Sequence, residues 1–327
     1  MTAEVAIVVP YFQRQPGVLR GTVQKVFAQR NAPTFELIIV DDGSPVPVDG
    51  ELAGLEPPPH ARITLVRQAN AGIAGACNAG LAAVPPTATW IARLDSDDHW
   101  DPDHLATAVK ALRQGYDFFF ANEQGGEPVP RFAVQGFSPE DHTLLDDAEQ
   151  IYAIRGDFLP IMLRHGQFCS STVVMRRSRF ADLRYRPTYN LCEDMHLFLD
   201  VALASPRVAF SPKVHVTHGP GIHFNQINDW KSDRSLRVAM DYFDYYRRLV
   251  RDSIPAGDQA AAIQAKYKQA TDDVATILLA MVKSGRMPEW RVVSGFLAAG
   301  PAVIGNLATV LAARLFRSQE LTPSKAG

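Results

Sequence analysis

The first hundred residues alternate between continuous apolar runs and segments with helical spacing, and this alternation most constrains the fold. Four runs read as strands, at EVAIVVPYF, FELIIVDDGS, ARITLVRQ and TATWIARLDSDD. Two intervening segments, GVLRGTVQKVFAQR and AGACNAGLAAV, place apolar residues at helical intervals. Apolar strands connected by helices are typical of a parallel sheet that is buried on both faces. The sequence therefore predicts an α/β fold with a mostly parallel sheet flanked by helices.

The rest of the chain is less regular. Strands are expected in DFFFANEQGG, at the start of FCSSTVVMRRSRF, where the strand should enter a helix, and in RVAFSPKVHVTHG. The segment NLCEDMHLFLDVALASP predicts an amphipathic helix that ends before Ser205-Pro206. Residues 229–285 read as helices. We therefore expect a catalytic domain over 1–228 and a helical extension over 229–327.

The segment 292–313 contains no charged residue, and Arg291 and Arg314 flank it. Its length meets the roughly 20 residues that a membrane-spanning helix needs. Glycine, proline and asparagine interrupt it, at Gly300, Pro301, Gly305 and Asn306. Two interpretations stay open: a segment that spans a membrane or lies on its surface, and a buried or dimerising helical hairpin that breaks at Gly300-Pro301.

Charge and cysteine content exclude several classes of protein. The formal net charge of −2 gives no electrostatic footprint for nucleic acid. Three widely spaced cysteines form neither a disulfide framework nor a CxxC pair, which favours a reducing cytoplasm. The start, MTAEVAIVVPYF, has neither a basic region nor a cleavage site, so we interpret it as a first strand rather than a signal peptide.

Polar and aromatic residues follow three of the expected strands. They are Pro10 to Phe12, then Asp41 to Ser44, and then the acidic run Asp95-Ser96-Asp97-Asp98. In parallel sheets, ligands bind beyond the carboxyl ends of the strands, so these residues should share one edge. Asp41 there could accept a hydrogen bond from a nucleobase or a ribose hydroxyl, although an Asp-Gly turn after a strand explains this segment equally well.

The acidic run needs a positive partner, because its three carboxylates would otherwise repel one another. A divalent cation such as Mg²⁺, held by one or two carboxylates and substrate phosphates, would supply it. The alternative is a helix cap, since Asp101 before Pro102 suits a helix start. Capping does not explain Asp95, Asp97 and Asp98 together.

Three further groups are candidates for function. The glycine-rich NAGIAGACNAG opens a helix that could approach a phosphate, but it matches neither GxGxxG nor a Walker motif. Glu193 and Asp194 lie near the start of an apolar helix. Paired acids there are usually a solvated face, yet one could take a proton from an attacking hydroxyl. Of the histidines at 215, 218 and 223, we expect His218 to complete the coordination of the cation rather than to form a zinc site.

Taken together, these residues resemble the family 2 glycosyltransferases with the GT-A fold. The matches, in family order, are VAIVVPYFQR, ELIIVDDGSP, QANAGIAGACNAGL, IARLDSDDHWDPDHL and NLCEDMHLFLD. They span about residues 4–225. The form PYFQRQPGVLRGTVQKVFAQ is most similar to bacterial exopolysaccharide glycosyltransferases of the succinoglycan type.

The resemblance implies roles for the matching positions. Asp95-Ser96-Asp97 would be the DXD motif that holds Mn²⁺ or Mg²⁺ on the donor diphosphate, with Asp98 beside it. Asp194 would be the catalytic base, with Glu193 on the acceptor side. The remaining donor and sugar contacts would come from Pro10, Phe12, Asp41, Asn78 and Trp100. Many relatives carry a basic residue before this asparagine, where this chain has Cys77, so a diphosphate contact is missing here or falls to Arg93 or Arg67.

The implied reaction is metal-dependent transfer of a hexose, such as glucose, from a UDP-sugar to a saccharide acceptor, with inversion in a single displacement. A lipid-linked acceptor and a cytoplasmic enzyme at the inner face of the cell membrane would fit 292–313. Two other classes of protein are the alternatives. A sugar nucleotidyltransferase should carry a glycine-rich basic signature near its start, which VVPYFQRQPG lacks. The other is a non-catalytic nucleotide- or saccharide-binding subunit of a polysaccharide assembly complex, against which the full set of acids argues.

Overall fold

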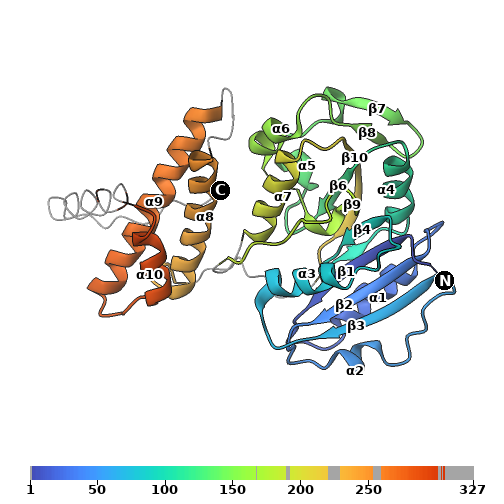
Figure 1. Ribbon diagram of the computed structural model, residues 1–327, viewed down its shortest axis with the longest axis horizontal. Coiled ribbons are helices and arrows are strands. Elements are labelled where there is room, and N and C mark those ends of the chain that lie inside the picture. Colours follow the sequence, from blue (N-terminus) through green and yellow to red (C-terminus); the bar gives the residue numbers. More distant parts are fainter. Residues whose placement is uncertain are drawn as a thin grey trace. The chain divides into compact units, whose positions relative to one another are not determined.

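The computed structural model describes residues 2–166, 168–188, 192–219, 229–252, 259–300, 303 and 305. The chain divides into two compact units (Figure 1). The first contains Met1–Arg186 and His196–Ile222, and the second contains Pro187–Met195 and His223–Gly327. Helix α7 (Glu193–Leu203) therefore begins in the second unit and continues in the first.

The first unit is built on one ten-stranded sheet. Its parallel part confirms the four strands expected at the start of the chain, namely β1 (Val5–Tyr11), β2 (Phe35–Asp41), β3 (Ala61–Arg67) and β4 (Trp90–Arg93). β2 and β4 flank β1, and β3 pairs with β2 on the outer side. Residues that leave these strands at their carboxyl ends are thus delivered to one edge.

The second half of the sheet is mixed. The antiparallel strand β9 (Val174–Arg176) joins β4 to β6 (Phe118–Gln124), and β6 pairs in parallel with β10 (Val208–Thr217). The short strands complete it: β5 (His99–Trp100), β7 (Thr143–Asp146) and β8 (Ile151–Ala153). This arrangement brings the end of β6, the end of β10 and the chain after β4 to one region.

Alternate strand residues face opposite layers of helices, as the pleat of a sheet requires. Helices α1 (Val18–Phe27) and α4 (His104–Arg113) pack on one face, and α3 (Gly72–Ala82) packs on the other. Gly80 allows the close approach of α3, since a Cβ there would lie 2.3 Å from Val8 Cγ1. The remaining helical segments are α2 (Val48–Leu52), α5 (Arg131–Val134), α6 (Phe158–His165), and the 3₁₀ turns η1 (Pro139–Asp141) and η2 (Ser170–Thr172).

The described part of the second unit is helical, which confirms the helices expected over 229–285. Its helices are α8 (Asp233–Arg251), α9 (Ala260–Lys283) and α10 (Trp290–Leu297). They share a core that includes Phe243, Val274 and Phe296. Within the described residues, no helix has the length and apolar character needed to cross a membrane. Most of 301–313 lies outside the described residues, so the alternatives for that part of 292–313 stay open.

One expected helix was wrong. No helix directly follows β9, because Arg177 turns back onto the first half of the sheet. Its backbone amide donates to Thr89 O at 2.9 Å, and its Nε donates to Ala88 O at 2.8 Å. Helix α4 begins at His104, two residues after Pro102. The Asp101 carboxylate accepts a hydrogen bond from the backbone amide of Asp103 at 3.0 Å, a contact of the kind that caps a helix start.

Candidate functional site

The ends of β1, β2 and β4 are joined by hydrogen bonds, which confirms the shared edge. The backbone amide of Gln13 donates to Ser44 Oγ at 2.9 Å, and its side-chain amide donates to Ser96 Oγ at 3.2 Å. Asp41 accepts from the backbone amide of Ser44 at 2.9 Å. The adjacent Asp42 is buried. The three segments that follow these strands are therefore held together by hydrogen bonds and do not form independent loops.

The glycine-rich segment is held against this edge by Asp42. Its Oδ1 accepts from the backbone amide of Ala71 at 2.8 Å and from Gln68 Nε2 at 2.7 Å. Helix α3 then starts at Gly72, as expected. Asn78 lies further along α3, and its side-chain amide makes two hydrogen bonds with the backbone of Tyr185, at 2.9 and 2.8 Å. Those bonds give Asn78 a structural task that the sequence did not suggest.

Two carboxylates of the acidic run are held by neighbouring side chains. The guanidinium of Arg93, whose side chain is only 5% exposed, pairs with Asp95 Oδ1 at 2.7 Å. The hydroxyl of Ser171 donates to Asp98 Oδ2 at 2.6 Å and accepts from the backbone amide of Asp95 at 3.0 Å. Burial and the nearby Asp95 carboxylate raise the pKa of Asp98 to about 7. Arg93 is thus one of the positive groups that the acidic run requires.

The second positive group is His218, which follows β10. Its Nε2 lies 2.5 Å from Glu123 Oε2, and this hydrogen bond raises the pKa of His218 to about 9. Cys169 Sγ lies 3.9 Å from the same nitrogen, and burial raises the pKa of that thiol well above its usual range. Asp98, Cys169 and His218 each offer one ligand atom, and these atoms all lie within 4.8 Å of one another.

This cluster, called here the Asp98–Cys169–His218 cluster, offers donors of two kinds to a divalent cation. The carboxylate oxygen and the imidazole nitrogen suit Mn²⁺, whereas the thiol is a soft donor that neither Mn²⁺ nor Mg²⁺ prefers. His218 would bind a cation only after losing the proton that its carboxylate partner stabilises. The structure places His218 in the cluster with Asp98, and the ligand roles expected for Asp95, Asp97 and His218 stay predictions.

Sequence reasoning missed three residues around the cluster, namely Glu123, Cys169 and Ser171. It placed Asp98 beside the metal motif rather than in the cluster with His218. One signal was available for Glu123. It stands near the end of an apolar strand, where a buried acid needs a partner. Cys169 and Ser171 carried no such signal, because only the position of η2 beside β4 and β6 brings them here.

The other expected site residues are placed as follows. Pro10 is buried within β1, and Phe12 is partly buried just after it. Trp100 is 2% exposed and donates from Nε1 to Ser171 O at 2.7 Å, so it supports the cluster from within. Arg67 pairs with Asp49 at 2.6 Å on the surface.

Glu193 and Asp194 occupy the first turn of α7, as expected. Asp194 Oδ1 accepts a hydrogen bond from the backbone amide of Met195 at 2.7 Å. Both acids belong to the second unit, whereas the metal cluster belongs to the first. Their catalytic roles therefore stay predictions.

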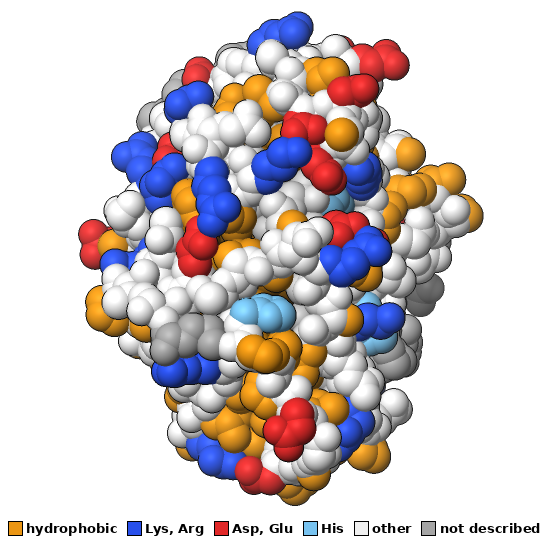
Figure 2. Space-filling model, turned by 90° about the vertical axis from the view of Figure 1, so that its right-hand side faces the viewer, with side chains coloured by type: hydrophobic (Ala, Val, Ile, Leu, Met, Phe, Trp, Pro, Cys, Tyr) orange, Lys and Arg blue, Asp and Glu red, His pale blue; other side chains and the backbone are white. Residues whose placement is uncertain are grey.

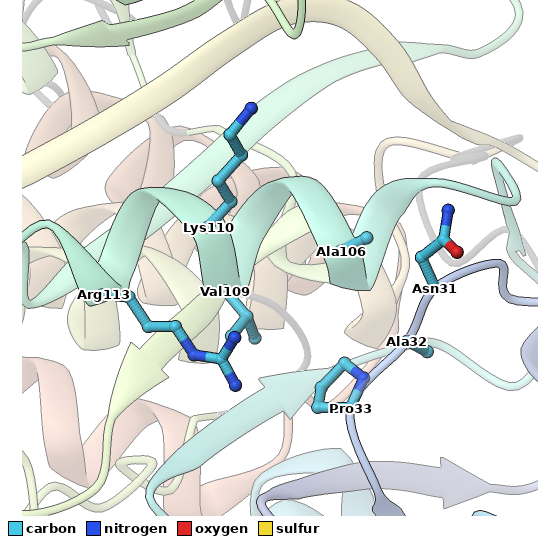
Figure 3. A pocket seen from close by; sticks show the side chains of 7 residues that line it. All are labelled: Asn31, Ala32, Pro33, Ala106, Val109, Lys110 and Arg113. Atoms are coloured by element: carbon cyan, nitrogen blue, oxygen red, sulfur yellow. The ribbon is translucent and has the colours of Figure 1, made fainter.

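A surface pocket of about 260 Å³ lies beside α4 and does not include the cluster (Figure 3). Its two cations are already paired, Lys110 with Asp146 and Arg113 with Glu4. No carboxylate lines it. On the face shown in Figure 2, basic and acidic side chains are interspersed.

Comparison with known proteins decides the family. The model of Glycosyl transferase family 2 matches residues 6–151. The chain is 32% identical to the succinoglycan biosynthesis protein ExoW of Rhizobium meliloti over 329 aligned positions, which cover 96% of this chain and 100% of that protein. The chain belongs to the family 2 glycosyltransferases. It is therefore a glycosyltransferase enzyme.

Solved structures place this family 2 glycosyltransferase in the GT-A fold. S. aureus TarS, residues 1–349 in complex with UDP-GlcNAc, is 16% identical, with a TM-score of 0.55 over 99% of this chain and 97% of that one. The mannosyltransferase PcManGT from Pyrobaculum calidifontis, in complex with GDP-Man and Mn²⁺, is 16% identical, with a TM-score of 0.57 over 98% and 89%. These likenesses confirm the expected fold.

Proposed function

We propose that this glycosyltransferase moves a hexose from a UDP-sugar to a saccharide acceptor, and that Mn²⁺ or Mg²⁺ assists the departure of the diphosphate. The observation that carries the proposal is the Asp98–Cys169–His218 cluster, which lies where the acidic run leaves β4. Substrates of parallel sheets bind at this edge. The similarity to a succinoglycan biosynthesis protein supports a saccharide acceptor, and the UDP-GlcNAc and GDP-Man complexes of proteins with the same fold support a nucleotide-sugar donor.

Within this proposal each residue has a chemical task. A cation held by the Asp98–Cys169–His218 cluster would neutralise charge on the departing nucleoside diphosphate. Arg93 and Ser171 fix the Asp95 and Asp98 carboxylates, and Glu123 orients the His218 ring. Asp95 and Asp97 complete the acidic side of the donor site.

The nucleotide and acceptor tasks fall to other residues. Asp41, Pro10 and Phe12 would bind the nucleoside at the ends of β1 and β2. Asp194 would take the proton of the acceptor hydroxyl, whose oxygen attacks the anomeric carbon while the bond to the diphosphate breaks. One displacement of this kind inverts the anomeric configuration. Glu193 would assist on the acceptor side.

The proposal also covers the acceptor and the cellular location of the enzyme. Exopolysaccharide repeats assembled on a lipid carrier would place the acceptor at a membrane. We therefore propose a lipid-linked saccharide acceptor, with glucose as the transferred hexose, and a peripheral enzyme at the inner face of the cell membrane.

The metal site is tested with neutral isosteres. Asp98→Asn keeps the shape and the contact with Ser171 but removes the charge, so we expect Mn²⁺ affinity to fall about 10–100-fold. Asp97→Asn should likewise lower the affinity for UDP in the presence of Mn²⁺. Titration of free Mn²⁺ by electron paramagnetic resonance, with and without UDP, measures both effects.

A matched control is Asp49→Asn, which removes a surface carboxylate that pairs only with Arg67 in the described contacts. It should bind Mn²⁺ as the wild type does. Wild-type affinity in Asp98→Asn would contradict the cluster as the metal site, and unchanged metal dependence in Asp97→Asn would remove that residue from it. A higher melting temperature with UDP and Mn²⁺ together than with either alone would support the donor site.

A further inference from the structure

Helix α10 carries apolar side chains on its buried face and also on an exposed side. Val292 and Phe296 lie four residues apart on one face and are buried in the core of the second unit. Trp290 and Leu297 lie seven residues apart, which places them together on a side about 130° around the helix from the buried pair. There Trp290 is 73% exposed and Leu297 is 38% exposed. A surface helix ordinarily carries polar residues away from its buried stripe, so these two exposed apolar side chains are unusual.

Two more exposed apolar residues precede α10 in the chain. Met287, in the loop between α9 and α10, is 87% exposed, and Val282 in the last turn of α9 is 59% exposed. We call Val282, Met287, Trp290 and Leu297 the Trp290 patch. Four large exposed apolar side chains within 16 residues are the kind of feature that an interaction site leaves on a surface.

Two basic side chains accompany this patch. Lys283 and Arg291 are exposed, whereas Arg286 pairs with Asp229 at 2.5 Å. The acid nearest in sequence, Glu289, is engaged by Arg237 at 2.7 Å. An apolar surface with basic side chains beside it complements a surface that offers both hydrocarbon and negative charge.

We propose that the Trp290 patch docks the enzyme on the surface of an anionic lipid bilayer. Tryptophan favours the boundary between headgroups and hydrocarbon because its ring is apolar while its N–H is polar. Lysine and arginine beside it are attracted to anionic headgroups. Helix α10 has eight residues, far fewer than the roughly 20 that span a bilayer, so it would lie along the interface. The inference rests on the proposed location of the enzyme at a membrane surface. It does not depend on which donor sugar the enzyme uses.

Vesicle co-sedimentation of the full chain tests the inference. The vesicles are phosphatidylcholine alone or an equal mixture of phosphatidylcholine and phosphatidylglycerol. We expect binding to the mixed vesicles, and at least about a tenfold loss of partitioning in the double variant Met287→Asp with Trp290→Asp. A second variant, Lys283→Gln with Arg291→Gln, should lose its preference for the anionic mixture.

The matched control is Val129→Asp with Val134→Asp, because these valines are 46% and 48% exposed in the first unit. This control should bind vesicles as the wild type does. Melting temperature and Mn²⁺-dependent UDP binding are measured for every variant. These two measurements report on folding and on the donor site without any bilayer. Failure of the sugar-transfer proposal can therefore be distinguished from failure of the membrane inference.

Two results would overturn the inference. The first is failure of the vesicle test: either the wild-type chain does not sediment with the mixed vesicles, or the Met287→Asp, Trp290→Asp variant sediments equally well. The second is that the wild-type protein dimerises in solution without binding vesicles, while the double variant is monomeric. In that case a second copy of the chain covers the patch.

Discussion

Asp194→Asn reduces sugar transfer by about 10²–10⁴-fold in our account, the range that a general base contributes. Asparagine has the shape of aspartate but cannot take the proton of the acceptor hydroxyl. Its carbonyl oxygen can still accept the hydrogen bond that Met195 N donates to Asp194 Oδ1 at 2.7 Å. Initial rates of transfer, together with the dissociation constant of UDP in the presence of Mn²⁺, separate the loss of a base from the loss of binding.

Asp200→Asn is the matched control for this experiment. Asp200 lies on the same helix and pairs with Arg186 at 3.2 Å, and we assign it no role in the reaction. Its transfer rate should stay close to that of the wild type. Full activity in Asp194→Asn would refute the assignment of the base. Loss of UDP binding in that variant would show that Asp194 acts on the donor instead.

Gly219→Ala should disable the metal site through the backbone. A Cβ at Gly219 would lie 1.8 Å from the carbonyl oxygen of Asp97, so the two segments would have to move apart. This movement would displace His218 from Asp98 and Cys169. We expect Mn²⁺ affinity to fall about 10–100-fold, with a loss of about 1–3 kcal/mol in the free energy of unfolding from overpacking. Mn²⁺ titration and chemical denaturation measure the two effects.

Gly126→Ala provides the comparison, because a Cβ at Gly126 meets no atom within 4 Å. It lies two residues beyond β6 and should change neither Mn²⁺ affinity nor stability. Normal Mn²⁺ binding in Gly219→Ala would show that the close contact with Asp97 does not hold His218 in place. The cluster would then need another explanation for its geometry.

The parallel half of the sheet could be predicted because its signal is local. β1 and β2 are seven-residue runs of mainly apolar residues bounded by turns, and burial on both faces demands that pattern. The edge strand β3 has the same length but is mostly half-buried, and among the described strands it pairs only with β2. β9 is different. It has three residues, and its pairing with β4 and β6 joins segments more than 50 residues apart. No local pattern specifies such a partner, and the arginines after β9 follow tertiary hydrogen bonds rather than helix propensity.

In the candidate site, too, residues with a local sequence signal could be predicted, and contacts set by strand pairing could not. The strand-end rule placed Asp41 and Asp95 at one edge. His218 lies beside Asp98, and its role as a metal ligand stays a prediction. The parallel pairing of β10 with β6 brings Glu123 beside His218, and that pairing could not be read from either strand alone. Arg93 did offer a signal. Side chains two residues apart in an extended segment point the same way, so an arginine two residues before Asp95 was its natural partner.

Release of nucleotide from donor sugars tests the central claim most directly. The purified chain would be incubated with UDP-, GDP- and dTDP-sugars, each with Mn²⁺, Mg²⁺ or EDTA. Our account predicts slow release of UDP from one UDP-sugar, dependent on Mn²⁺ or Mg²⁺ and abolished by EDTA, even without an acceptor. Absence of release from every donor, together with absence of metal-dependent UDP binding, would contradict it.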